Sequence, residues 1–127
     1  MKQNILRILA VIPGIPMLLN GIGFLTKPEE AAASLGMDLL EGMGRSTQIG
    51  DTASFFIGIS ILTIVGAITV RGRWLYAAAL FLGLAAISRL IAALALDAAM
   101  ATQFIGAEIV LTLWLCIVAY FINRLPK

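Results

Sequence analysis

Apolar residues in this chain gather into four long runs that are separated by short polar segments. The runs cover about residues 5–25, 46–70, 74–96 and 103–122. A helix needs about 20 apolar residues to cross the hydrocarbon core of a bilayer. The pattern therefore predicts an all-α integral membrane protein, a four-helix bundle whose spans form a single transmembrane domain over residues 1–127.

The overall composition agrees with this pattern. Apolar residues make up 61% of the chain and charged residues only 13%, whereas a soluble domain has about 25% charged residues. The net charge of +2 does not indicate a nucleic-acid partner, because the basic residues stand singly or in pairs between apolar runs. They are instead signals of membrane topology, and membrane lipids are the expected surroundings.

The distribution of Lys and Arg predicts an orientation. Loops that remain in the cytoplasm are enriched in these residues. With four spans, both termini lie on the same side as the second connection, and these segments carry more cations than the other two connections. We therefore predict cytoplasmic termini, from Lys2, Arg7, Arg71, Arg73, Arg124 and Lys127 against Lys27 and Arg45.

The connection between the first and second spans contains signals for a short helix. Pro28 suits a first helical turn, Glu29 and Glu30 favour the positive end of a helix, and Gly36 can end one. We predict a helix over about 28–35 on the outward side. It is either a simple connector or a lid over a site.

Each span carries a polar residue at a similar depth near its outward end: Asn20, Asp51, Arg89 and Glu108. At 1.5 Å per helical residue these groups lie about 8 to 10 Å below the outer surface. Because charged groups inside a bilayer face the bundle interior and pair, we predict a buried cluster in which Arg89 bridges both carboxylates. Gln48, one turn before Asp51, lies on the same face.

Two interpretations of this cluster remain open, and a third involves only lipid headgroups. Buried ion pairs in helix bundles can serve architecture alone by specifying which helices meet. The same groups can also form a ligand or proton site that opens to the outer aqueous side. Pro13 and Pro16 should kink the first span, which either improves packing or shapes a groove.

Several kinds of chemistry are disfavoured by the residues present. Cys116 is the single cysteine and there is no histidine, so we expect neither a dithiol centre nor a metal site. No phosphate loop, nucleophile elbow or dinucleotide-binding motif is present. We therefore expect no enzymatic activity and no cofactor, apart from a quinone or another lipid.

Four features together resemble a known family. They are the segments LTKPEEAAASLGM, GRSTQIGDTASFFIGISIL and WLYAAALFLGLAAISRL, and the lone Glu108 of the fourth span. They resemble a family of small four-span bacterial inner-membrane proteins that is distantly similar to DoxX-like proteins. The resemblance implies a multi-pass protein of the bacterial inner membrane and hints at a quinone or a larger assembly. The matching polar positions are Gln48, Asp51, Arg89 and Glu108, while the dithiol motif of some DoxX relatives is absent.

Three functions follow as expectations. The first is a non-enzymatic subunit or accessory factor of a larger membrane complex, docked through small-residue faces to protein partners or to further copies of itself. The second is a binding site for a quinone or another lipid-soluble ligand around Asp51, Arg89 and Glu108. The third is a small proton-coupled transporter, which at this length would have to act as a dimer.

Overall fold

The computed structural model describes residues 1–126, and in this range the chain is helical, without strands. Lys127, which contributes to the charge count above, lies outside the described residues. The helices are α1 (Lys2–Val11), α2 (Gly14–Thr26), α3 (Pro28–Ser34), α4 (Gly42–Thr69), α5 (Gly72–Ala95) and α6 (Thr102–Asn123).

Four helical stretches are long and apolar enough to cross a membrane: α1 with α2, and then α4, α5 and α6. Their bounds agree within a few residues with the four predicted spans. The all-α fold with four apolar spans is thus confirmed, and the chain is a multi-pass membrane protein.

The first span is broken where Pro13 occurs, as its sequence predicts. Helix α1 ends at Val11, and Pro13 caps the start of α2. Proline has no N–H, so the carbonyl of Leu9 loses its partner four residues later. The indole Nε1 of Trp114 on α6 donates a hydrogen bond of 2.8 Å to this carbonyl.

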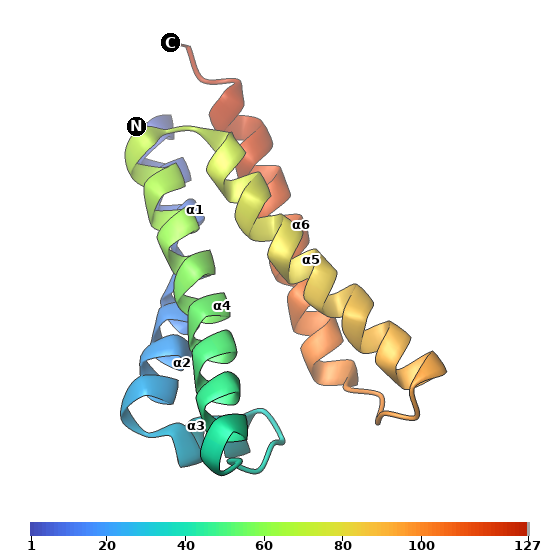
Figure 1. The fold of residues 1–127 in the computed structure, drawn as a ribbon. Coiled ribbons are helices and arrows are strands. Elements are labelled where there is room, and N and C mark those ends of the chain that lie inside the picture. Colours follow the sequence, from blue (N-terminus) through green and yellow to red (C-terminus); the bar gives the residue numbers. More distant parts are fainter. Residues whose placement is uncertain (127) are drawn as a thin grey trace.

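The spans form two arms that meet at one end of the molecule and diverge toward the other (Figure 1). Helix α2 packs against α4 in one arm, α5 packs against α6 in the other, and α1 contacts both α4 and α6. Both described ends of the chain and the α4–α5 turn lie at the joined end, which we call the termini end (Figure 1). Helix α3 and the α5–α6 loop lie at the opposite, far end.

Glycines allow close contact within and between the arms. A Cβ on Gly21 of α2 would lie 2.5 Å from Cγ1 of Ile57 on α4. The backbone N–H of Gly72 at the start of α5 donates to Oδ1 of Asn123 on α6 at 3.1 Å. Where the arms join, a Cβ on Gly66 would lie 2.7 Å from a methyl of Leu75. Small residues therefore fix the helix pairs, as in many membrane bundles.

The short helix predicted between the first two spans is present as α3. It ends at Ser34, and Gly36, two residues later, has a φ of +72°, a left-handed conformation that favours glycine. The N–H groups of Gly36 and Met37 donate to the carbonyls of Ala33 and Ala32, both at 3.0 Å. This pair of bonds is a Schellman motif, which turns the chain toward α4.

Candidate functional site

Arg89 on α5 and Glu108 on α6 form an ion pair inside the second arm. Nε of Arg89 donates to Oε1 of Glu108 at 2.9 Å. The side chain of Glu108 is 11% exposed and that of Arg89 is 35% exposed, so the acid is enclosed while the base reaches a surface. The guanidinium carbon of Arg89 also lies 5.0 Å from the ring centroid of Phe104, which adds a cation–π contact.

The second carboxylate oxygen of Glu108 has no hydrogen-bond partner within the described residues. Oε2 is buried, and neither Arg89 nor another group donates to it. The nearby hydroxyl of Thr112 donates instead to the backbone carbonyl of Glu108, at 2.7 Å. An unpaired acceptor in an apolar surrounding costs about 1 to 3 kcal/mol, so a hydrogen-bond donor that reached this oxygen would be stabilising.

Asp51 lies on α4, in the other arm, and it is exposed. It borders a cavity of about 580 Å³ between α4 and α5. We call this cavity and the space beyond it, between the diverging arms, the inter-arm cleft. The cavity is lined by Asp51, Ser54, Phe55, Gly58, Ile59, Ile61 and Leu62 from α4 and by Phe81 from α5.

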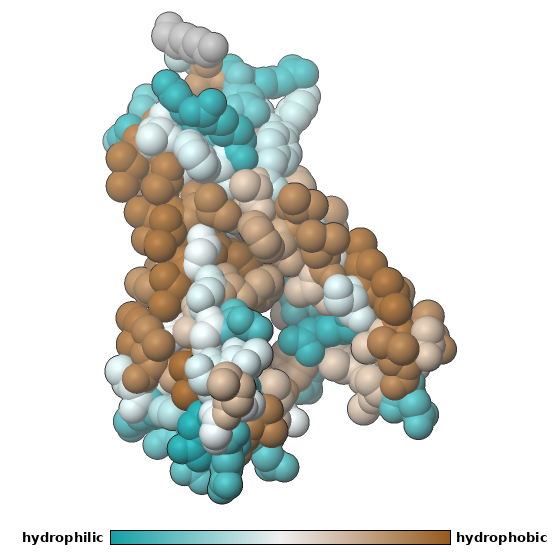
Figure 2. All heavy atoms as spheres, viewed as in Figure 1, coloured by the Kyte–Doolittle hydropathy of each residue, from teal (hydrophilic) through white to brown (hydrophobic). Residues whose placement is uncertain are grey.

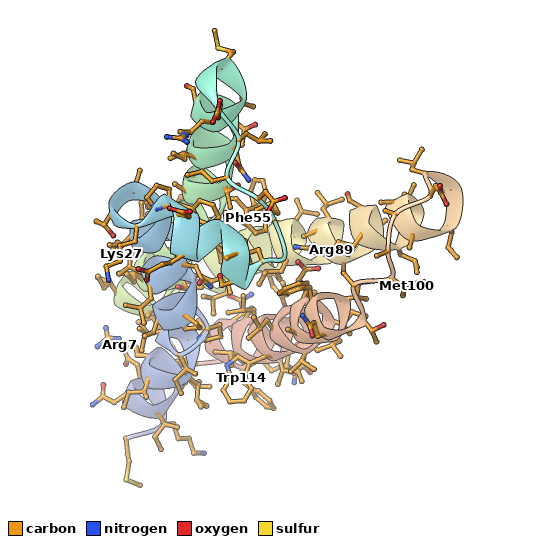
Figure 3. The ribbon with its side chains drawn as sticks, turned by 90° about the horizontal axis from the view of Figure 1, so that it is seen from below. Arg7, Lys27, Phe55, Arg89, Met100 and Trp114 are labelled. Carbon is orange, nitrogen blue, oxygen red and sulfur yellow. The ribbon has the colours of Figure 1, made fainter. Side chains whose placement is uncertain are left out.

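The inter-arm cleft opens at the far end of the molecule. Figure 2 shows the hollow from the side, with apolar residues where the arms join and hydrophilic atoms on both walls farther out. Seen from the far end, Phe55 and Arg89 lie on facing sides of α4 and α5 (Figure 3). Arg89 is eight residues beyond Phe81 along α5, about 12 Å nearer the open end.

The predicted bridge from Arg89 to two carboxylates is wrong for one of them. Within residues 1–126, Arg89 pairs with Glu108, and Asp51 has no ion pair. Asp51 and Arg89 belong to different arms, and these arms are farthest apart at the far end (Figure 1). Equal depth therefore places the two side chains on opposite walls and not in one cluster.

The predicted place of Gln48 in the cluster is wrong. Its side chain forms hydrogen bonds with the segment before α4, and it is not among the residues that line the cavity. Oε1 accepts from the N–H of Leu40 at 2.9 Å, and Nε2 donates to the carbonyl of Asp38 at 3.0 Å. Nε of Arg45 donates to the carbonyl of Leu40 at 2.7 Å, so the first turns of α4 hold this segment in place.

Asn20 is half-buried on α2. This helix packs against α4, α3 and α1, and it has no comparable contact with α5 or α6. Asn20 is therefore on the arm opposite to Arg89 and Glu108, and it is not part of their ion pair.

Two aromatic residues that lie beside the polar groups do not follow from the pattern of polar residues in the spans. Phe104 precedes Glu108 by four residues, one helical turn, so the spacing did carry a signal. Phe81 lies in a run of apolar residues, and nothing in the sequence separates it from residues that face lipid. Within residues 1–126, no group of three or more His, Cys, Asp or Glu side chains is placed to hold a metal ion.

The arrangement suits a molecule that is mostly apolar with a small polar head. Oε2 of Glu108 needs a donor, the outer nitrogens of Arg89 can donate to an acceptor, and aromatic rings line the approach. No family model, curated protein or solved structure matches this chain.

Proposed function

We propose that this chain is a non-enzymatic protein of the bacterial inner membrane that binds a lipid-soluble molecule with a polar head in the inter-arm cleft. The observation that supports this most is the buried Oε2 of Glu108, which has no hydrogen-bond partner among residues 1–126. Architecture alone needs the ion pair with Arg89, but it gains nothing from an unpaired acceptor. A bound hydroxyl would supply the missing hydrogen bond.

The site favours a ligand that both donates and accepts hydrogen bonds. A quinol meets this requirement, because one hydroxyl can donate to Glu108 and its oxygen can accept from Arg89. Its flat ring can also pack against Phe55 or Phe81, which line the cavity. The DoxX-like resemblance points to the same class. With both termini in the cytoplasm, the cleft would open toward the outer face of the membrane.

The test is to identify what the protein retains after gentle solubilisation. The purified full-length protein is extracted with organic solvent, and the small molecules are identified and quantified by mass spectrometry. We expect a quinol, its quinone or a hydroxylated lipid in near-stoichiometric amount. Glu108→Gln removes the charge and one acceptor, and we expect retention to fall about tenfold, the factor that corresponds to 1.4 kcal/mol.

A matched control separates this effect from a general loss of charge. Glu41→Gln makes the same chemical change at an exposed position before α4, at the same end of the molecule. It should leave retention unchanged. Equal retention in the Glu108→Gln protein, or only bulk phospholipid in the wild-type extract, would contradict a ligand site.

A second candidate is a subunit of a larger membrane assembly, and it has its own observation. Gly50, Ser54 and Gly58 form a stripe of small residues on α4. Within residues 1–126, no other side chain or helix lies within 4 Å of a Cβ placed at either glycine. Such stripes let a second helix approach closely. The partner would be another protein or a second copy of this chain.

The test for this candidate is the mass of the particle in mild detergent. A defined complex larger than the monomer, disrupted by Gly58→Leu, would support it. A monomer that keeps a small molecule would instead support the ligand site. Gly58 also lines the cavity of that site.

A further inference from the structure

A second groove lies on the outside of the molecule near the termini end. One wall is formed by α1 and the start of α2, and the other wall is formed by the last turn of α4. The groove has a volume of about 490 Å³. Apart from Arg7, it is lined by Ile8, Val11, Ile12, Ile15, Ala67 and Ile68. Figure 3 shows Arg7 on the side of α1 away from Trp114. The groove is therefore separate from the inter-arm cleft.

Arg7 has unused hydrogen-bonding capacity in this apolar groove. Its Nη2 donates to the carbonyl of Ile68 at 3.4 Å, which is long for a hydrogen bond of this type. Its Nε is buried and has no partner within residues 1–126. A guanidinium carries five N–H donors, and the protein accepts a hydrogen bond from one of them. An anion with several oxygens could accept hydrogen bonds from donors that remain free.

No acidic residue of this chain is placed to neutralise Arg7. Residues 1–28, which include α1 and α2, and residues 52–96, which include α5 and the second part of α4, contain no acidic residue. Within the described residues Arg7 forms no ion pair. Other cations, including Arg71 and Arg73, lie at the same end. The charge around the groove therefore attracts an anion.

The shape of the groove matches the direction in which a phospholipid lies in a bilayer. Arg7 is near the start of α1, and Ile15 is eight residues farther along, about 12 Å deeper. The residues between these positions are apolar. Ile8, Ile12, Ile15 and Ile68 are all more than two-fifths exposed, so their surfaces face whatever fills the membrane next to them.

We propose that this groove is a binding site for an anionic phospholipid of the leaflet next to the termini, with its phosphate on Arg7 and one acyl chain along Ile8, Ile12 and Ile15. A zwitterionic lipid offers the same acyl chain but no net charge. The site should therefore discriminate between headgroups. This inference does not depend on a ligand in the inter-arm cleft.

The experiment is a competition between two lipids with identical acyl chains. The full-length protein is incubated with equal amounts of phosphatidylglycerol and phosphatidylcholine, and bound lipid is counted by native mass spectrometry. We expect a preference for phosphatidylglycerol that falls about fivefold in Arg7→Gln, the effect expected for one cation near a lipid surface. Arg71→Gln removes an equal charge at the same end and should lower the preference much less.

Equal losses in the two variants would show diffuse attraction to a cationic surface and would overturn the proposal. An unchanged preference in Arg7→Gln would also overturn it. Soluble glycerol phosphate at the same concentration should not displace the lipid. If glycerol phosphate displaces the lipid, the headgroup alone accounts for binding, the acyl chain does not bind in the groove, and the proposal is overturned.

A measurement on the wild-type protein covers the case in which Arg7→Gln does not fold. Phosphatidylglycerol with a photoreactive group in one acyl chain is bound and illuminated, and the labelled peptides are sequenced. Labels should gather on residues 8–15 and 67–68. Labels spread evenly over all four spans would exclude a defined site.

Discussion

The indole of Trp114 donates its hydrogen bond to the backbone carbonyl of Leu9, 105 residues earlier in the sequence and on another span. The carbonyl is free because Pro13 has no N–H to donate to it. In a membrane, a backbone group freed by proline must find a partner inside the protein. The kink and the tryptophan therefore act together: one creates an acceptor and the other uses it to attach α1 to α6.

Replacing Trp114 with Phe should lower the free energy of unfolding by about 1 to 2 kcal/mol, since it removes one interhelical hydrogen bond and leaves the Leu9 carbonyl unpaired. The measurement is unfolding in mixed detergent micelles with increasing dodecyl sulfate. In a Pro13→Ala background, residue 13 regains an N–H for Leu9. The effect of Trp114→Phe should then shrink, and an equal effect in both backgrounds would argue against the proposed pairing.

Gly21 and Gly58 give a matched pair of substitutions within the spans. A Cβ at Gly21 would lie 2.5 Å from Ile57, whereas within residues 1–126 no other side chain or helix lies within 4 Å of a Cβ at Gly58. Gly21→Ala should therefore destabilise by about 1 to 3 kcal/mol through overpacking of α2 against α4. Gly58→Ala should be neutral, or stabilising by up to about 1 kcal/mol, because alanine favours a helix.

The same unfolding assay compares the two alanine variants with the wild type. Equal destabilisation by both would mean that another helix already packs on Gly58, and it would favour the assembly candidate. A neutral Gly21→Ala would contradict the close α2–α4 contact.

In the structure, the Gln48 side chain holds the segment from Met37 to Leu40 in place. Gln48→Glu can still accept from the N–H of Leu40, but it cannot donate to the carbonyl of Asp38. We expect faster amide exchange in residues 37–40 and a loss of about 1 kcal/mol in stability. Hydrogen exchange with mass spectrometry measures the first effect, with the exposed neighbour Thr47→Ala as the control. Unchanged exchange would show that Arg45 alone fixes the segment.

Much of the fold could be predicted from the sequence, because hydropathy over about 20 residues and the fixed rise of a helix determine where spans begin and end. The contacts within the candidate site were harder to predict. Arg89 and Glu108 could be matched in depth, and they meet because α5 and α6 pack along each other. Asp51 lies at the same depth but on the other arm. The divergence of the arms depends on contacts such as Gly66 with Leu75, whose geometry the sequence does not reveal.

Gln48 shows a second limit of counting along a helix. The apolar run begins near residue 46, and this pattern places Gln48 in the membrane layer. Helix α4 begins earlier, at Gly42, and the preceding segment folds back within reach of the Gln48 amide. Such a contact across a loop depends on how that loop turns, here at Gly36, and no spacing rule predicts it.

Arg89 and Glu108 should be strongly coupled in stability. Arg89→Met alone leaves the carboxylate of Glu108 buried without a cation and should cost about 3 kcal/mol, the low end for a broken buried pair because Arg89 is partly exposed. Arg89→Met with Glu108→Met removes both charges and should cost clearly less than the sum of the single changes. A sum that is simply additive would show that the pair does not form in the membrane.

Asp51 provides the complementary test, because it distinguishes the open arms from a closed four-residue cluster. Among the described residues Asp51 has no ion-pair partner, and it lies on the arm opposite to Arg89. Asp51→Asn should therefore change stability by no more than about 0.5 kcal/mol. Combined with Arg89→Met, its effect should add to within about 0.5 kcal/mol, as expected for residues that share no contact. A coupling as large as that between Arg89 and Glu108 would mean that the arms close in the membrane and that Asp51 then reaches Arg89. The same double-mutant cycle, repeated with the extracted ligand added back, would show whether binding brings the two walls together.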